Sequence, residues 1–298
     1  MNVIVHGGAG SVPEDPESRQ AVLDTAARTG MKAETPVEAV CAAVGVLEDS
    51  PRFNAGIGGA VQSDGVIRTD AGIMTEDRSA GAACSMPGVA RAVEVARTVM
   101  EETPHVMLSG VHAVDFAAEY GIGIEEDLWS SRTRERWNEL NPPEGGPREQ
   151  LAWVRERFGE TAEDPEGREI KGDPKDHDTV GAVASDGERV AAATSTGGRW
   201  LALAGRVGDV PQIGGGFYCA PAGGASATGA GEDIARVTLS RQAVDHLEAG
   251  ASAQEAANRA IAEFADLTDS TAGIIVCDRD GETGSAYNSD LMQTKALD

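Results

Sequence analysis

The sequence predicts an α+β fold that combines buried strands with amphipathic helices. Short runs of small apolar residues at 2–5 and 180–184 are typical of buried strands. Capping boxes at 35–38 and 252–255 mark the starts of two helices. Hydrophobic residues make up 41% of the 298-residue chain, aromatic residues only 4%, and there are 37 glycines. We therefore expect a sizeable core of Ala, Val, Leu and Ile packed closely around glycine turns.

The first 120 residues alternate between the two kinds of element. The expected strands lie at about 2–5, 60–62, 66–74 and 79–84, and the expected helices at about 16–29, 35–48, 89–101 and 110–120. The glycine-rich stretch 6–10 is expected to close the first strand as a tight turn. The sequence Ser63-Asp64-Gly65 is typical of a hairpin turn between the second and third strands.

The amino-acid composition changes at the start of the second half. From 121 to 178 the chain is charged, with helical pieces only around 132–140 and 148–158, so we expect a long and flexible connector. After it, the expected strands lie at about 180–184, 189–194, 225–227, 272–277 and 284–287, with helices from 232 to about 248 and from 252 onward.

Charge and composition exclude several classes of protein. The formal net charge of −24 argues against binding to nucleic acid and to anionic membranes. Such self-repulsion is typical of halophiles, so we expect a salt-rich cytoplasm, and full stability in dilute buffer would contradict this. No basic stretch followed by a long apolar run opens the chain, which favours a cytoplasmic location. The four cysteines are far apart, so we expect isolated buried thiols.

Thr179 stands at the junction between the charged connector and an apolar strand. A threonine that starts a strand is ordinary by itself. If the chain is cut after Asp178, however, the hydroxyl of Thr179 gains the freed α-amine as its own base. That amine has an unperturbed pKa of about 7.7–8, which is close to working pH. Thr179 is therefore a candidate nucleophile.

Glycine-rich motifs elsewhere leave alternatives open. The stretch 6–10 could be a phosphate loop or an oxyanion turn, but the full G-x-G-x-x-G and G-x-S-x-G patterns are absent. Asn54, which lies among glycines, could be only a turn residue. Asp70 places a carboxylate inside a predicted strand.

Taken together, these motifs resemble the plant-type (isoaspartyl-dipeptidase) L-asparaginases, which are N-terminal-nucleophile hydrolases. The matching strings are His6-Gly7-Gly8-Ala9-Gly10, Phe53-Asn54-Ala55-Gly56-Ile57-Gly58, Asp70-Ala71, Pro104-His105-Val106-Met107, Thr179-Val180-Gly181-Ala182-Val183, Thr194-Ser195-Thr196-Gly197-Gly198, Gly205-Arg206-Val207-Gly208-Asp209 and Thr228-Gly229-x-Gly231-Glu232. Their order and spacing match over nearly the whole chain, except for the connector.

The resemblance implies a four-layer αββα sandwich formed by a single domain, 1–298. It implies autocleavage before Thr179 into an α subunit, 1–178, and a β subunit, 179–298, which assemble as (αβ)2. It also implies hydrolysis of L-asparagine and of β-aspartyl dipeptides, which are small-molecule substrates.

The resemblance assigns roles to residues of the catalytic centre. Thr179 would be the nucleophile, and Thr196 would hold its hydroxyl. Thr228 and the Gly229 N–H would form the oxyanion hole, with Asn54 near the nucleophile.

Further roles concern substrate binding and maturation. Arg206 would bind the substrate α-carboxylate and Asp209 its α-amine. The same substrate site would include Thr228, Gly229 and Gly231. An exposed ion pair would be the ordinary alternative for Arg206 and Asp209. The remaining positions are assigned to the autocleavage site: Asp178, Thr179, His6, Gly7 and Gly8.

The loop 47–57 resembles the sodium-binding loop of the family, so a structural Na⁺ is implied although no cofactor is required. Its ligands would be mostly backbone carbonyls, from the positions Leu47, Glu48, Ser50, Phe53, Ala55 and Ile57.

One residue departs from the family pattern. Asp178 stands where the asparaginases usually have glycine, and Asp-Thr is instead the pattern of glycosylasparaginases and threonine aspartases. Either activity is therefore an alternative. A third alternative is an uncleaved module that binds an amino acid through Arg206 and Asp209 without turnover.

Overall fold

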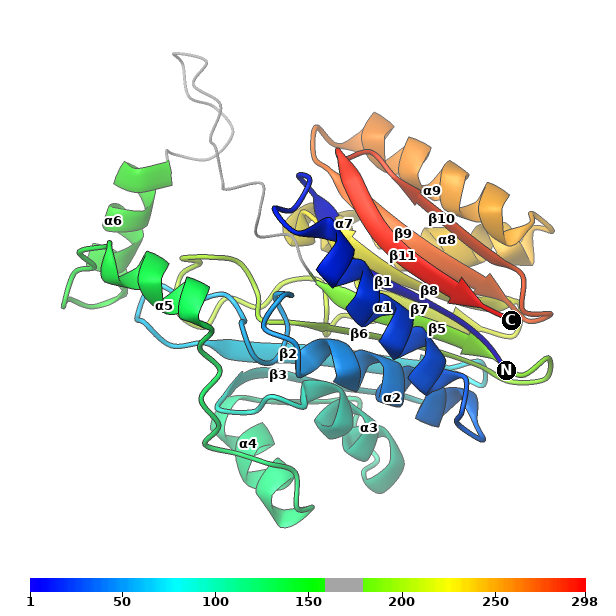
Figure 1. Cartoon of the computed structure of the whole chain (residues 1–298), viewed down its shortest axis with the longest axis horizontal. Coiled ribbons are helices and arrows are strands. Elements are labelled where there is room, and N and C mark those ends of the chain that lie inside the picture. The colour runs from blue at the N-terminus through cyan, green and yellow to red at the C-terminus, as the bar shows by residue number, and fades with distance from the viewer. Residues whose placement is uncertain (159–178) are drawn as a thin grey trace.

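The computed structural model describes residues 1–158 and 179–298 and arranges them as two stacked sheets between layers of helices (Figure 1). The larger sheet has the order β11 (Leu291–Leu297), β1 (Asn2–Gly10), β5 (Val180–Ser185), β6 (Val190–Thr196), β2 (Arg68–Thr75), β3 (Ala80–Pro87), β4 (Met107–Ser109). The smaller sheet has the order β10 (Thr283–Tyr287), β9 (Ala272–Asp278), β8 (Gly223–Gly229), β7 (Phe217–Ala220). Pairing is antiparallel apart from β3 with β4.

Helices cover the outer face of each sheet. The helices of the described residues are α1 (Pro16–Gly30), α2 (Pro36–Glu48), α3 (Ala92–Glu102), α4 (Gly110–Glu119), α5 (Ser131–Asn138), α6 (Pro147–Phe158), α7 (Gly231–Val237), α8 (Leu239–Glu248) and α9 (Ala253–Leu267). Helices α2 and α3 pack on the larger sheet, and α8 and α9 pack on the smaller one. The prediction of an α+β sandwich is confirmed.

The two sheets meet face to face through an interior of small side chains. Strands β5 and β6 contact β8, and β2 contacts β7. A Cβ added at Gly72 would lie 2.0 Å from the Phe217 ring, and one at Gly224 would lie 3.0 Å from the Val183 side chain. These glycines let the sheets approach closely, as the glycine-rich and aromatic-poor composition predicts.

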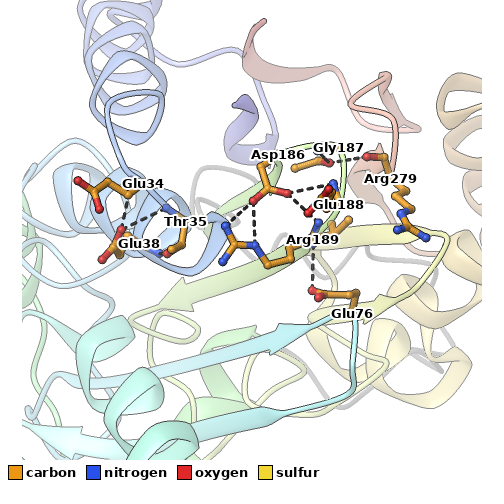
Figure 2. Close-up of polar contacts among 11 residues, drawn as sticks. Glu34, Thr35, Glu38, Glu76, Asp186, Gly187, Glu188, Arg189 and Arg279 are labelled. Carbon is orange, nitrogen blue, oxygen red and sulfur yellow. Dashed lines mark hydrogen bonds and ion pairs between the residues drawn. The ribbon is translucent and has the colours of Figure 1, made fainter.

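The turn between β5 and β6 fixes the register of that hairpin (Figure 2). Asp186 accepts hydrogen bonds from the backbone N–H groups of Glu188 and Arg189 at 3.0 and 2.7 Å, and its carboxylate also pairs with the Arg189 guanidinium. The Val190 N–H donates to Glu76 at 3.0 Å. With this turn closed, Ser185 lies opposite Val190 and Val180 lies opposite Ser195. Continuing that register places Thr179 opposite Thr196.

The structure differs from the sequence prediction at several elements. The strand β1 continues through Gly10 instead of ending at a turn, because a register irregularity between His6 and Ala9 absorbs the glycines. The strand expected at 60–62 is an isolated bridge between Val61 and Ile67. The helix expected at 232–248 is two helices, interrupted at Thr238, where φ is +54°. Strands β4, β7 and β11 were not predicted.

The described part of the connector packs against the body of the protein. The predicted helical pieces are α5 and α6. Trp137 and Leu140 join a cluster with Val61 and Leu201, and the Leu128 carbonyl accepts the Gly58 N–H at 2.7 Å. Residues 159–178, including Asp178, lie outside the described residues. Within the described ranges, no helix is long and apolar enough to span a membrane.

Candidate active site

The candidate nucleophile lies at the entrance to the central strand β5. Thr179 immediately precedes β5 and is 8% exposed. Its hydroxyl donates to Thr196 Oγ1 at 3.1 Å. Thr196 in turn donates to the Asn54 carbonyl at 3.3 Å and accepts the Gly198 N–H at 3.1 Å. The predicted contact between the two threonines is therefore present, and Thr196 is held in place by the loop that follows it.

Asn54 supports this arrangement from behind Thr196. Its side-chain amide donates to the Gly198 carbonyl at 2.5 Å, and its side-chain oxygen accepts the Ala60 N–H at 2.7 Å. Its carbonyl also accepts the Gly197 N–H at 2.8 Å. A Cβ at Gly197 would lie 2.4 Å from the Gly59 Cα, so only glycine fits at this crossing. Asn54 thus acts on the nucleophile through the Thr196 loop.

Packing between the sheets places Thr228 across from Thr179. A Cβ at Gly181 would lie 2.0 Å from Ser226 Oγ, while Gly224 faces Val183. Val183 of β5 thus faces Gly224 of β8, and Gly181 faces Ser226. Side chains alternate with a period of two, so the next pair in this series is Thr179 and Thr228. Thr228 is fully buried at this point. This is the position that the predicted oxyanion hole requires.

Gly229 follows Thr228 at the end of β8, where the backbone conformation excludes a side chain. Its φ is +134°, and a Cβ would lie 2.4 Å from the Thr271 carbonyl oxygen. Gly229 pairs with Ala272 of β9. The predicted donor pair therefore lies on a rigid strand of the smaller sheet.

His6 connects the two sheets beside the nucleophile. Its Nε2 lies 2.9 Å from Ser226 Oγ, which lies 2.6 Å from Thr194 Oγ1, and Thr194 donates to the Gly216 carbonyl at 2.8 Å. Since the Thr194 proton is used on that carbonyl, Ser226 donates to Thr194 and His6 donates from Nε2 to Ser226. Complete burial lowers the pKa of His6 to about 3, against the opposing influence of the Thr179 backbone. His6 is therefore neutral.

The two glycines after His6 have packing reasons of their own. Gly8 has φ +105°, and a Cβ at Gly7 would lie 2.5 Å from the Phe53 ring. The Gly7 carbonyl accepts a hydrogen bond from the buried Arg19 guanidinium at 2.6 Å. The structure thus brings His6 to the Thr179 backbone and packs Gly7 against Phe53 and Arg19, whereas Asp178 lies outside the described residues.

A charged site lies on the loop between β6 and β7. The Arg206 guanidinium makes two parallel bonds to Glu232, each 2.8 Å long. Asp209 is 6% exposed, and burial, opposed by Arg206, raises its pKa to about 7. A Cβ at Gly231 would lie 2.5 Å from Asp209 Oδ1 and 2.9 Å from an Arg206 nitrogen. The three predicted residues Arg206, Asp209 and Gly231 are therefore in contact range.

Sequence reasoning missed the role of Glu232. This residue is in the first turn of α7 and pairs with Arg206. Burial raises the pKa of Glu232, but the bonds and charge of Arg206 outweigh burial and hold it at about 2. The signal in the sequence was an acidic residue directly after Gly231. An acidic residue there is also expected simply because it stabilises the N-terminus of a helix.

The loop 47–57 is the predicted sodium site. The carbonyls of Leu47, Glu48 and Ser50 accept backbone hydrogen bonds from Ser50, Ile57 and Phe53 at 3.2, 2.9 and 3.3 Å. A Cβ at Gly56 would lie 2.4 Å from the Glu48 carbonyl oxygen, so the loop is tightly wound. Each carbonyl keeps a second lone pair, and oxygen ligands suit a hard cation. The loop therefore contains oxygen donors of the type that a hard cation prefers, and sodium binding stays a prediction.

The pKa of Asp209 predicts pH-dependent binding of ligands that carry an α-ammonium. Protonation below about pH 7 removes the negative charge that would pair with the ammonium. We expect the inhibition constant of L-aspartate to rise as the pH is lowered from 8 to 6. Succinate, which lacks the ammonium, is the control and should bind equally well or better in acid. A pH-independent inhibition constant for L-aspartate would contradict the prediction. Arg206, Glu232 and Asp70 are the charged groups around Asp209.

The chain is similar to known proteins over almost its full length. A family model described as asparaginase matches residues 1–298. A plant-type L-asparaginase of Pyrococcus furiosus is 39% identical, over 97% of this chain and 94% of the relative. The isoaspartyl peptidase/L-asparaginase of Danio rerio is 35% identical over 99% and 91%, and that of Bos taurus is 36% identical over 97% and 91%. With a match over its full length and relatives aligned almost from end to end, the chain belongs to the asparaginase family.

Proposed function

We propose that this protein is a self-cleaving amidohydrolase that uses Thr179 to hydrolyse L-asparagine and β-aspartyl dipeptides. The observation that carries the proposal is the 3.1 Å contact between the Thr179 and Thr196 hydroxyls. Arg206 and Asp209, which interact electrostatically on the loop between β6 and β7, support it. A guanidinium and a carboxylate in one site recognise the two charges of a free amino-acid head. The names of the relatives support both activities.

The first reaction is cleavage of the chain itself. Thr179 Oγ attacks the carbonyl carbon of residue 178, the C–N bond breaks, and the hydroxyl proton passes to the released amine. Water then hydrolyses the resulting ester, which yields the carboxylate of residue 178 and restores the Thr179 hydroxyl. The buried, neutral His6 beside the Thr179 backbone and the hydroxyl of Thr196 hold the attacking residue in place.

The second reaction is turnover of substrate. The free amine of Thr179 takes the hydroxyl proton, and Oγ attacks the side-chain carbonyl of the substrate. The negative oxygen that forms is stabilised by Thr228 and by the Gly229 N–H, which is usually the largest catalytic effect in acyl transfer. Ammonia or a peptide amine leaves with the proton, and water hydrolyses the β-aspartyl ester to release L-aspartate.

The alternatives are a glycosylasparaginase and a threonine aspartase-type protease, which the Asp178-Thr179 sequence favours. A non-catalytic amino-acid-binding module is the third. The family names favour asparaginase and isoaspartyl peptidase activity, and the hydroxyl pair of Thr179 and Thr196 is unnecessary in a binding module.

The proposal is tested by product release from three substrates. The protein is first incubated in high salt until chain cleavage stops. It is then given L-asparagine, β-aspartyl-leucine or N-acetylglucosaminyl-asparagine, and the L-aspartate released from each substrate is quantified. We expect turnover of the first two. Turnover of the glycosylated substrate alone would establish the glycosylasparaginase, and tight binding of L-aspartate without turnover would establish the binding module.

We further propose that the cleaved halves assemble as (αβ)2, with Na⁺ bound in the loop 47–57 as a structural ion. The net charge of −24 supports a salt-rich cytoplasm as the working environment.

A further inference from the structure

Asp70 is a buried carboxylate that the mechanism above does not use. It lies in β2 and is 2% exposed. In the described part of the chain, its carboxylate has one hydrogen bond, from the Ser85 N–H to Oδ1 at 2.7 Å. A carboxylate this deeply buried is costly unless it serves a partner or a ligand.

The direction of the Asp70 side chain follows from the sheet register. Asp70 lies directly opposite Thr196 in the antiparallel ladder, so the two side chains share one face and their Cβ atoms are about 4.5–5.5 Å apart. Gly72, two residues along the same strand, meets the Phe217 ring of the smaller sheet. That face of β2 therefore points between the sheets, where Thr196 contacts Thr179.

The backbone beside Asp70 is shaped to hold it there. The pairing of β2 with β3 is irregular between Thr69 and Ala71, at Asp70 itself. Across this irregularity, Ser85 has φ +56°, a left-handed conformation that few non-glycine residues adopt. It is Ser85 that donates its N–H to Asp70. Bulges and unfavourable backbone angles of this kind concentrate at functional sites, where they re-aim a side chain.

The charge of Asp70 reaches the predicted amino-acid site. Burial has the largest influence on the pKa of Arg206 and of Asp209, and the charge of Asp70 raises both. Burial also raises the pKa of Asp70 to about 7, while the Ser85 N–H and the charge of Arg206 lower it. The acids around Arg206 are Asp70, Asp209 and Glu232. When they are ionised, their combined negative charge exceeds the single positive charge of Arg206. The pairing of Arg206 with Glu232 leaves Asp70 and Asp209 to attract a cationic group of the ligand.

We propose that Asp70 is a second substrate-binding carboxylate, which acts with Asp209 to attract the α-ammonium of the aspartyl head and so selects substrates with a free α-amine. This inference rests on the proposed function, and it adds a specificity residue on the larger sheet to those on the loop between β6 and β7. Ligands that lack the ammonium should gain nothing from Asp70 and should be repelled by it.

The test compares inhibition constants of L-aspartate and succinate, which differ by the ammonium, at pH 8.5. In Asp70→Asn we expect the constant for L-aspartate to rise roughly 10- to 100-fold, because a hydrogen bond or contact to a charged group is lost. The constant for succinate should stay level or fall. Asp266→Asn, an exposed acid in α9, makes the same change in net charge and should leave both constants unchanged.

The outcomes separate this inference from its alternatives. A purely structural role, or a role in orienting Arg206, would weaken both inhibitors alike and would overturn the proposal. If Asp70→Asn does not fold, Asp70→Ser keeps an acceptor for the Ser85 N–H and removes the charge. The ratio of the inhibition constants of L-aspartate and succinate then decides in the same way. Wild-type protein that neither turns over asparagine nor binds L-aspartate would refute the proposed function itself. Normal turnover with an unchanged ratio in the variants would refute the role of Asp70 alone.

Discussion

Replacing the nucleophile, as Thr179→Ala, should leave a single uncut chain and abolish turnover. The variant loses both the hydroxyl that attacks the preceding carbonyl and the group that Thr196 holds at 3.1 Å. For comparison, removing the nucleophile of a serine protease costs roughly 10⁶-fold in rate, and we expect a loss of at least about 10⁴-fold here. The intact mass in high salt should show fragments 1–178 and 179–298 for the wild type only.

Two further variants sharpen this experiment. Thr179→Ser keeps a hydroxyl and should still be cut. Thr25→Ala removes an exposed threonine hydroxyl that donates to the Ala21 carbonyl within α1, so this variant should be cut and active like the wild type. Cleavage of Thr179→Ala at the same bond would show that another group attacks, and an intact wild-type chain would point to a missing trigger at Asp178.

Replacing the guanidinium, as Arg206→Gln, should impair substrate binding while leaving chain cleavage intact. Each hydrogen bond to a charged group is worth about 1.5–3 kcal/mol, so losing two such bonds to the substrate carboxylate should lower kcat/KM roughly 10²- to 10⁴-fold. The loss should fall mainly on KM. The bond cut during maturation presents no free α-carboxylate, so intact mass should still show two fragments.

Arg236→Gln provides the matched control for this prediction. Arg236 is also a guanidinium paired with an acid of α7, Asp233, but its side chain is 72% exposed. Exposed pairs are worth about 0–1 kcal/mol, so kinetics should not change. A kcat/KM for Arg206→Gln within about threefold of the wild type would show that Arg206 serves Glu232 rather than the substrate.

Parts of the candidate site were predictable as neighbours because they are local in sequence. Thr179 and Thr196 belong to one hairpin, and the turn that aligns them contains Asp186-Gly187, a strong turn signal. Arg206 and Asp209 are three residues apart on one loop. In each case a short stretch contains both the functional groups and the glycines that position them.

What the sequence did not reveal depends on long-range packing. Strand β11 is recognisable only through its pairing with β1, almost the full length of the chain away. The break at Thr238 places a non-glycine residue at φ +54°, a conformation that no propensity favours. Asp70 was visible as a carboxylate in a strand, but its proximity to Arg206 required the stacking of one sheet on the other.

The order of strands in the larger sheet has a consequence for the mature protein. The proposed cut before Thr179 would assign β1 to the first fragment, yet β1 pairs with β11 on one side and with β5 on the other, and both would belong to the second fragment. The fragments are therefore interlaced, and neither can leave without opening the centre of the sheet. Before the cut, refolding is a unimolecular process whose rate is independent of concentration. Afterwards two separate chains must find one another, so heat-inactivated mature enzyme should recover poorly on dilution even though the native fragments remain together.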